Sequence, residues 1–206
     1  MLKRSLITAP LLTLLFFAPW GAATAADAAA GEQLAGQVCV ACHGPGGNSM
    51  VPTFPNLAGQ AGGYIADQLA MMKAGERDVP EMVGFVANLS PDDMANLGAY
   101  YASQSANPAA IPESDVESAE RGERLYRGGD QAMGIAACVS CHLPDGKGIP
   151  EAYPRVANQH LDYLKKQLLA YKSGERVSRG RIMNDVAFLL SLQQIDDVAT
   201  YMHALK

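Results

Sequence analysis

The two halves of this chain carry the same short motifs in the same order. The sequence CVACH, at residues 39–43, returns as CVSCH at residues 138–142, an offset of 99 residues. Each copy spans about 90 residues, which exceeds most solenoid repeat units and suits a duplicated small domain. Three further pairs follow the same order: FPNLAGQ (54–60) with YPRVANQ (153–159), KAGER (73–77) with KSGER (172–176), and GEQLA (31–35) with GERLY (122–126).

The pattern within each copy is helical. Apolar residues at helical spacing predict helices over Tyr64–Lys73 and His160–Tyr171. Ser90 and Ser191 each precede a further helical stretch, and serine is a favoured N-cap residue. No alternating apolar run is long enough for a sheet, so the expected fold class is all-α. An aperiodic segment with two prolines predicts a linker, and the expected division is therefore residues 26–103, a linker at 104–118, and residues 119–206.

The N-terminus has the pattern of a bacterial export signal. A basic start at Lys3 and Arg4 is followed by a short apolar run and a small-residue segment ending near Ala25. The apolar run is broken by Pro10 and is shorter than the roughly 20 residues that a membrane-spanning helix needs. We therefore expect residues 1–25 to be a cleaved signal peptide and the mature protein to be periplasmic.

The chain is acidic, with 16 Lys and Arg against 21 Asp and Glu and a formal net charge of −5. Such a balance argues against nucleic acid as a partner, because nucleic acid recruits basic surfaces. The acidic excess lies in the first half, which gives the molecule a charge asymmetry of the kind that orients an encounter with a partner. The basic residues of the second half are interpreted as a solvated helix face and loop: Lys165, Lys166, Lys172, Arg176 and Arg179.

The repeated Cys-x-x-Cys-His unit favours covalently attached haem. A disulfide framework is possible in an exported protein, but it gives no role to the histidine. A single four-sulfur zinc site needs the two pairs to meet, and a thioredoxin-like dithiol expects a βαβ context. Haem attachment uses both thiols, Cys39 with Cys42 and Cys138 with Cys141. It also places the adjacent histidine, His43 or His142, where its ring can reach the iron.

Symmetry between the copies selects the second iron ligand. Of nine methionines, Met82 and Met183 alone occupy equivalent positions, after the shared Gly-Glu-Arg and before the capped helix. The remaining histidines, His160 and His203, stand where the first copy has alanine, so we expect surface or local-packing roles for them. Axial coordination by histidine and methionine closes both faces of an iron and raises its potential. The pattern therefore predicts two one-electron centres.

The segments CVACHGPGGNS, FPNLAGQ, VPEMVGFVANLS and LYRGGDQAMGIAACVSCHLPDGKGI resemble the cytochrome c4 family of dihaem electron-transfer cytochromes. The resemblance covers essentially the whole mature chain. It implies two tandem class I cytochrome c domains, with His43 and Met82 on one iron and His142 and Met183 on the other. It also implies that the backbone carbonyls of Pro55 and Pro154 accept the ring protons of the two histidines.

The expected function is that of an electron carrier and not an enzyme. The family resemblance suggests a bc-type complex as donor and a terminal oxidase as acceptor, with the protein soluble or loosely associated with the membrane, as a monomer or weak dimer. One alternative is a dihaem enzyme, such as a peroxidase or a sulfur-compound dehydrogenase, which requires one open iron. Another is a dihaem electron-transfer subunit docked to a larger dehydrogenase, which the sequence leaves open.

Overall fold

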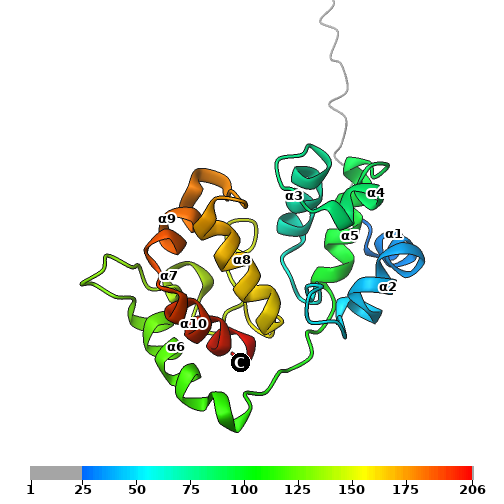
Figure 1. Ribbon diagram of the computed structural model, residues 1–206. Helices are drawn as coiled ribbons and strands as arrows, with labels where there is room; N and C mark the ends of the chain where they lie inside the picture. The colour runs from blue at the N-terminus through cyan, green and yellow to red at the C-terminus, as the bar shows by residue number, and fades with distance from the viewer. Residues whose placement is uncertain (1–24, 206) are drawn as a thin grey trace, which may run out of the picture.

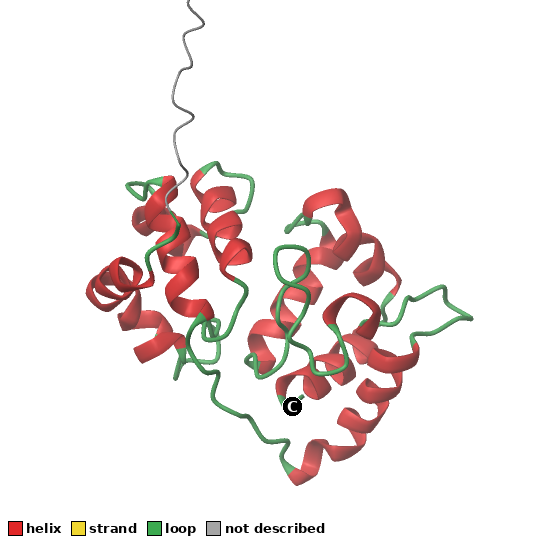
Figure 2. Ribbon diagram, turned by 180° about the vertical axis from the view of Figure 1, so that it is seen from behind, coloured by secondary structure: helices red, strands yellow, loops and turns green. Residues whose placement is uncertain are grey.

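The computed structural model describes residues 25–205 and is helical throughout, without a β-sheet in that range. Two groups of helices lie side by side, joined by one extended segment that runs along one edge of the molecule (Figures 1 and 2). We call α1–α5 the N-terminal domain and α6–α10 the C-terminal domain. The expected signal peptide lies almost wholly outside the described residues. Within the described range, no helix is both long and apolar enough to span a bilayer.

The N-terminal domain begins with one nearly continuous helix that ends at the first Cys-x-x-Cys-His motif. Its middle part widens into a π-helical stretch, η1. Asp27 caps the start, because its carboxylate accepts hydrogen bonds from the backbone N–H groups of Ala29 and Ala30. The elements are α1 (Ala28–Leu34), η1 (Ala35–Cys39), α2 (Val40–His43), η2 (Pro45–Gly47), α3 (Gly62–Lys73), η3 (Pro80–Met82), α4 (Val83–Val86) and α5 (Pro91–Ala102).

The C-terminal domain repeats this order with one interruption. Its first helix ends at Gly128, and a loop with a short antiparallel bridge between Asp130 and Ile135 precedes the second motif. This loop is the green excursion at the far left of Figure 1. The elements are η4 (Glu113–Asp115), α6 (Val116–Gly128), α7 (Val139–His142), α8 (Leu161–Ser173), η5 (Arg179–Arg181), α9 (Ile182–Leu189) and α10 (Leu192–His203).

Both predicted serine caps are present. The Ser90 hydroxyl accepts from the backbone N–H of Asp93, and the Asp93 carboxylate accepts in return from the N–H of Ser90. Ser191 and Gln194 make the same reciprocal pair at the start of α10. Each pair satisfies two N–H groups that a helix start leaves without a partner. The last helix of each domain therefore begins where the local sequence dictates.

Glycine brings the first and last helices of each domain into backbone contact. A Cβ atom added at Gly31 of α1 would lie 2.0 Å from the carbonyl oxygen of Asn96 in α5. A Cβ at Gly122 of α6 would lie 2.0 Å from the carbonyl oxygen of Asp197 in α10. No side chain fits at such a distance, so the glycine shared by GEQLA and GERLY sets how closely these helices cross.

The two domains differ in how much core they build. In the C-terminal domain, a large cluster around Tyr126, Ile195 and Val198 is fully buried. The N-terminal cluster is smaller and centres on Leu97 and Tyr101. Small domains with modest cores depend on a staple, a metal or a large ligand for stability. This dependence is greater for the N-terminal domain.

The first part of the connection is hydrogen-bonded to both domains. The Asn48 side chain donates to the carbonyl of Ser105 (3.0 Å) and accepts from the N–H of Asn107 (2.8 Å). Two residues later, the N–H of Ala109 donates to the Asn158 side chain of the C-terminal domain (3.2 Å). The 3-10 turn η4 begins at Glu113 and leads directly into α6, so the last six residues of the segment expected as a linker are helical.

Candidate haem-binding site

Each Cys-x-x-Cys-His motif forms one tight helical turn. In the second copy, the N–H of His142 donates to the carbonyl of Cys138 at 2.9 Å, which is the i to i−4 bond of an α-helix. The four cysteines are unpaired and half-buried, so neither motif forms a disulfide. Within residues 25–205, no three His, Cys, Asp or Glu side chains cluster in a way that would hold a metal ion. The structure thus gives no support to the disulfide and zinc alternatives.

The two motif histidines are buried and hydrogen-bonded alike. Nδ1 of His43 lies 2.9 Å from the carbonyl oxygen of Pro55, and Nδ1 of His142 lies 2.9 Å from that of Pro154. A carbonyl can only accept, so each Nδ1 carries the proton and each Nε2 keeps its lone pair. The expected role of the two proline carbonyls is confirmed. Burial lowers the pKa of both histidines, against a smaller opposing effect of the proline carbonyl, which favours the neutral ring that a metal requires.

A glycine-rich loop after each histidine brings the proline carbonyl into place. The carbonyl of Gly47 accepts from the N–H groups of Leu57 and Ala58, at 2.7 and 3.1 Å. Gly146 accepts in the same way from Val156 and Ala157, at 2.8 and 3.1 Å. Both glycines have positive φ, +79° and +65°, and a Cβ there would collide with neighbouring side-chain and backbone atoms. The repeated glycine is therefore what holds the proline segment against the motif helix.

One continuous cavity of about 530 Å³ brings the predicted site residues of both domains together. Met82 ends the η3 turn and Met183 lies in the first turn of α9, and both are half-buried at the cavity wall. Cys141 is the one predicted site residue that does not line this cavity. The others do: Cys39, Cys42, His43 and Met82 from the N-terminal domain, and Cys138, His142 and Met183 from the C-terminal domain.

Two buried arginines also line this cavity, and sequence reasoning missed their role. Arg77 donates to Gln68 of its own domain (2.8 Å) and to the Tyr163 hydroxyl of the other (3.0 Å). Its counterpart Arg176 donates to Gln167 of its own domain and to the Tyr64 hydroxyl of the other (2.9 Å). Arg176 is thus buried between the domains and does not lie on a solvated face. The repeated KAGER and KSGER motifs marked these positions, but gave no reason for the arginine.

The two guanidinium groups have no carboxylate partner among the ion pairs of residues 25–205. Their effect is visible at Tyr163. Burial acts to raise the pKa of this hydroxyl, but the charges of Arg77 and Arg176 outweigh it and hold the pKa below its usual value. A buried cation without an anion is costly. This cavity is therefore suited to a ligand that carries negative charge.

Of the remaining histidines, His203 makes a packing contact within its own domain, as expected from the sequence, whereas His160 contacts the other domain. Nε2 of His160 bonds the carbonyl of Ser49 across the domain interface at 2.9 Å. Nδ1 of His203 bonds the carbonyl of Gln159 at 2.7 Å. Neither residue lines the cavity. Both histidines therefore contribute to packing and not to the site.

The cavity residues fit haem c. Its attachment needs two thiols, a neutral imidazole with a free Nε2, and a soft second ligand. Each domain supplies this set, although the structure places Cys141 outside the cavity lining. Haem also carries two carboxylates, for which Arg77 and Arg176 are buried partners of the right charge. The combination of donors and charge matches this one group.

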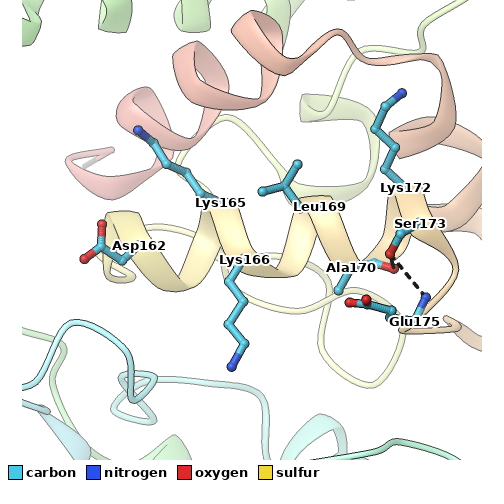
Figure 3. A pocket seen from close by; sticks show the side chains of 8 residues that line it. All are labelled: Asp162, Lys165, Lys166, Leu169, Ala170, Lys172, Ser173 and Glu175. Atoms are coloured by element: carbon cyan, nitrogen blue, oxygen red, sulfur yellow. Dashed lines mark hydrogen bonds between the residues drawn. The ribbon is translucent and has the colours of Figure 1, made fainter.

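A second, open hollow lies along α8 and holds none of these donors. Figure 3 shows its lysines projecting from the helix in different directions. Lys165 pairs with Asp196 (3.0 Å), and Nζ of Lys172 donates to the carbonyl of Phe188 (2.6 Å). Two of its three lysines are thus engaged within their own domain, and the hollow is a feature of the surface.

Comparison with known proteins agrees with this geometry. The cytochrome c family model matches residues 119–206, and the model for cytochrome c oxidase, cbb3-type, subunit III matches residues 26–100. A cytochrome c4 of Azotobacter vinelandii is 44% identical over 193 residues, covering 88% of this chain and 90% of that protein. A thiosulfate dehydrogenase electron acceptor of Thiomonas intermedia is 34% identical, over 98% of this chain and 91% of its own length. The crystal structure of reduced recombinant cytochrome c4 from Pseudomonas stutzeri superposes with a TM-score of 0.84 at 38% identity, covering 88% of this chain and all of that one.

Proposed function

Because this chain belongs to the cytochrome c4 family, we propose that it carries electrons from a bc-type complex to a terminal oxidase in the periplasm. Electron transfer with redox partners is the activity of the family, and the protein is a carrier and not an enzyme. Its two cytochrome c domains hold two covalently attached haem c groups. What we propose beyond this is the residue assignment, the partners and the location.

The proposed attachment residues are the four motif cysteines, Cys39 with Cys42 and Cys138 with Cys141. Nε2 of His43 and Sδ of Met82 are the proposed axial ligands in the N-terminal domain. His142 and Met183 take these roles in the C-terminal domain. We assign the two haem-binding units to residues 26–103 and 119–206.

The protein groups around each proposed haem serve to hold it in place and to limit rearrangement of its ligands. When bound, each haem supplies a one-electron couple between ferric and ferrous iron. The Pro55 and Pro154 carbonyls fix the orientation of the two imidazoles and increase their basicity. Methionine, a soft and neutral ligand, raises the potential and occupies the position that a substrate would need. Arg77 and Arg176 would neutralise haem carboxylates at the domain interface.

The observation that carries this proposal is the equivalence of the two sites. The histidine-to-carbonyl distance is 2.9 Å in each domain, and a methionine lines the shared cavity at the same place in each repeat. A dihaem peroxidase requires two dissimilar irons, one of them open to substrate. Two sites built alike favour storage or relay of electrons.

Axial ligation is tested by replacing methionines in the purified dihaem protein. Met82→Ala should remove about half of the methionine-to-iron absorption of the oxidised form, lower one of the two potentials, and allow one iron per chain to bind cyanide. Met183→Ala should do the same at the other haem. Met72→Ala is the matched control, because Met72 lines the same cavity but has no methionine counterpart in the second repeat. An unchanged spectrum in Met82→Ala would show that the ligand assignment is wrong.

A second candidate donor is a sulfur-oxidising dehydrogenase. The relative from Thiomonas intermedia, similar over 98% of this chain, is an electron acceptor of thiosulfate dehydrogenase. Stopped-flow reduction of the oxidised protein by a purified bc-type complex and by a thiosulfate dehydrogenase distinguishes the two. The physiological donor should reduce both haems at a rate that falls steeply with ionic strength, since charged surfaces steer such encounters.

We further propose a periplasmic location, after cleavage of residues 1–25, and a monomer or weak dimer that associates at most loosely with the membrane. Fractionation of cells that produce the protein tests the location, and N-terminal sequencing of the purified protein tests cleavage. Recovery in the cytoplasm, with residue 1 retained, would contradict both.

A further inference from the structure

Two glutamines reach from each domain into the haem-binding loop of the other. The side-chain oxygen of Gln60 accepts from the N–H of Arg155 at 2.8 Å, and its amide donates to the carbonyl of the same residue at 3.0 Å. Gln159 makes the same pair with Asn56, at 2.8 and 2.9 Å. Both side chains are buried, with 8% and 7% of their surface exposed. The two contacts are related by the repeat, so each domain binds the other through the same pair of hydrogen bonds.

The residues that the glutamines hydrogen-bond directly follow the prolines whose carbonyls accept from the proposed iron ligands. The N–H of Arg155 and the carbonyl of Pro154 belong to one peptide group, which is planar and conjugated. That carbonyl accepts from Nδ1 of His142 at 2.9 Å. The peptide group between Pro55 and Asn56 likewise joins Gln159 to His43, whose Nδ1 lies 2.9 Å from the Pro55 carbonyl. Each histidine is thus linked to the opposite domain through two hydrogen bonds that share one peptide group.

Hydrogen bonds in such a chain strengthen one another. An amide whose N–H is donated to an acceptor carries more negative charge on its carbonyl oxygen. That oxygen then accepts more strongly from the imidazole, which makes the ring a better electron donor to a bound metal. The glutamine also holds the peptide plane in its orientation, because it bonds the N–H and the carbonyl of the same residue. Polarising the peptide group and fixing its orientation both strengthen the hydrogen bond from the imidazole to the proline carbonyl.

We propose that Gln60 and Gln159 are positioning residues, each of which sets the reduction potential of the haem in the opposite domain. The inference rests on the proposed assignment of His142 and His43 as iron ligands. It makes the domain interface part of both redox centres. A change in the docking of the domains then alters both potentials without any change in the ligands.

Removing a glutamine should raise the potential of the opposite haem. A weaker bond from the ring N–H to the proline carbonyl makes the imidazole a poorer donor, which favours ferrous iron. In Gln60→Ala we expect the reduction equilibrium constant of the C-terminal haem to rise at least threefold. At 59 mV per tenfold change for a one-electron couple, this is a shift of about 28 mV. Gln159→Ala should produce the same shift at the N-terminal haem.

The experiment is a redox titration of the full-length dihaem protein that reports each haem separately. At each applied potential, the oxidised fraction of a haem is measured from the NMR signal of its own axial methionine methyl group, assigned with Met82→Ala and Met183→Ala. A second measurement is hydrogen exchange of the ligand imidazole N–H in the reduced protein labelled with ¹⁵N-histidine. In Gln60→Ala, exchange at His142 should accelerate while exchange at His43 stays unchanged.

Two further variants separate the hydrogen bonds from packing and from general loosening of the interface. Gln60→Met fills nearly the same volume but has no donor and only a weakly accepting sulfur, so it should shift the C-terminal haem in the same direction as Gln60→Ala. Asp67→Asn breaks the exposed interdomain ion pair with Arg179 (2.6 Å), which involves neither proline segment. In this variant, the reduction equilibrium constant of each haem should change by less than threefold.

The outcomes distinguish this inference from the ligand assignment. A shift at the opposite haem, with the methionine-to-iron absorption retained, supports it. A shift confined to the haem of the mutated domain, an equal shift at both haems, or no shift would overturn it while leaving the ligand assignment intact. Failure of both Gln60→Met and Gln159→Met to fold would also overturn it, because the glutamines would then be structural. Only an unchanged Met82→Ala spectrum removes the ligand assignment itself.

Discussion

The close approach of α6 and α10 at Gly122 predicts a large effect from one added methyl group. In Gly122→Ala, the new Cβ of α6 would lie 2.0 Å from the carbonyl oxygen of Asp197 and 2.5 Å from its carbonyl carbon, both in α10. Ordinary van der Waals contact begins at 3.4 Å. The obstacle is helix backbone, so no side-chain rotation can relieve the overlap. The two helices must separate by about 1.4 Å.

This separation acts on the best-packed part of the domain. Tyr126 on α6 and Ile195 and Val198 on α10 are among the largest fully buried side chains. Insertion of a methyl group into a well-packed core typically costs about 1–3 kcal/mol. Because rigid backbone has to move here, we expect about 3 kcal/mol. For a unit of this size, that corresponds to a fall of about 12 °C or more in the melting temperature of the C-terminal domain.

The measurement is denaturant and thermal unfolding of the dihaem protein, followed by far-ultraviolet circular dichroism. Gly128→Ala is the matched control, since Gly128 lies on the same helix and a Cβ there meets no atom within 4 Å. That change should leave stability unchanged or raise it by up to about 1 kcal/mol, because alanine restricts the unfolded chain. The reasoning is refuted if Gly122→Ala proves as stable as Gly128→Ala.

Two further predictions concern the same domain. The pKa of Asp197 lies below its ordinary value: burial acts to raise it, but hydrogen bonds from Arg121, Ser118 and Gln193 more than compensate. The contribution of the Asp197 carboxylate to stability is therefore complete above pH ~4 and is lost as the pH falls through its depressed pKa in the folded state. Asp197→Asn should thus lower the unfolding free energy by about 1–2 kcal/mol at pH 7 and by almost nothing in strong acid. Denaturant unfolding at each pH measures this difference, and a difference that does not change with pH would contradict the prediction. The buried Tyr126 hydroxyl donates to the carbonyl of Leu143 at 2.6 Å, so Tyr126→Phe should lower the unfolding free energy by about 1 kcal/mol, whereas unchanged stability would mean that water replaces the hydroxyl.

The two haem-attachment motifs could be predicted from the sequence, because their chemistry depends on local spacing. The order of two cysteines and a histidine within one helical turn is what haem attachment requires. The caps at Ser90 and Ser191 likewise involve residues three apart, and both were predicted correctly. The proline carbonyls that accept from His43 and His142 came from the family resemblance, and the structure confirms them.

The repeat also marked positions whose purpose the sequence did not reveal. Gln60, Gln159 and Arg176 stood out as shared letters of aligned motifs. Their hydrogen-bond partners in the opposite domain lie 95 to 112 residues away along the chain. The interpretation of Arg176 as part of a solvated face was wrong. A charged residue in a polar loop is usually exposed, and some of the partners that bury this one belong to the other domain.

The sequence by itself therefore determined what each domain binds, because thiol, imidazole and cap chemistry act over one turn of helix. Only the tertiary structure decided how the two sites are connected to each other. Docking of two folded domains brings Gln60 and Gln159 onto the peptide groups that orient the opposite histidines. Such contacts follow from the relative placement of finished surfaces, and no local pattern of residues specifies that placement.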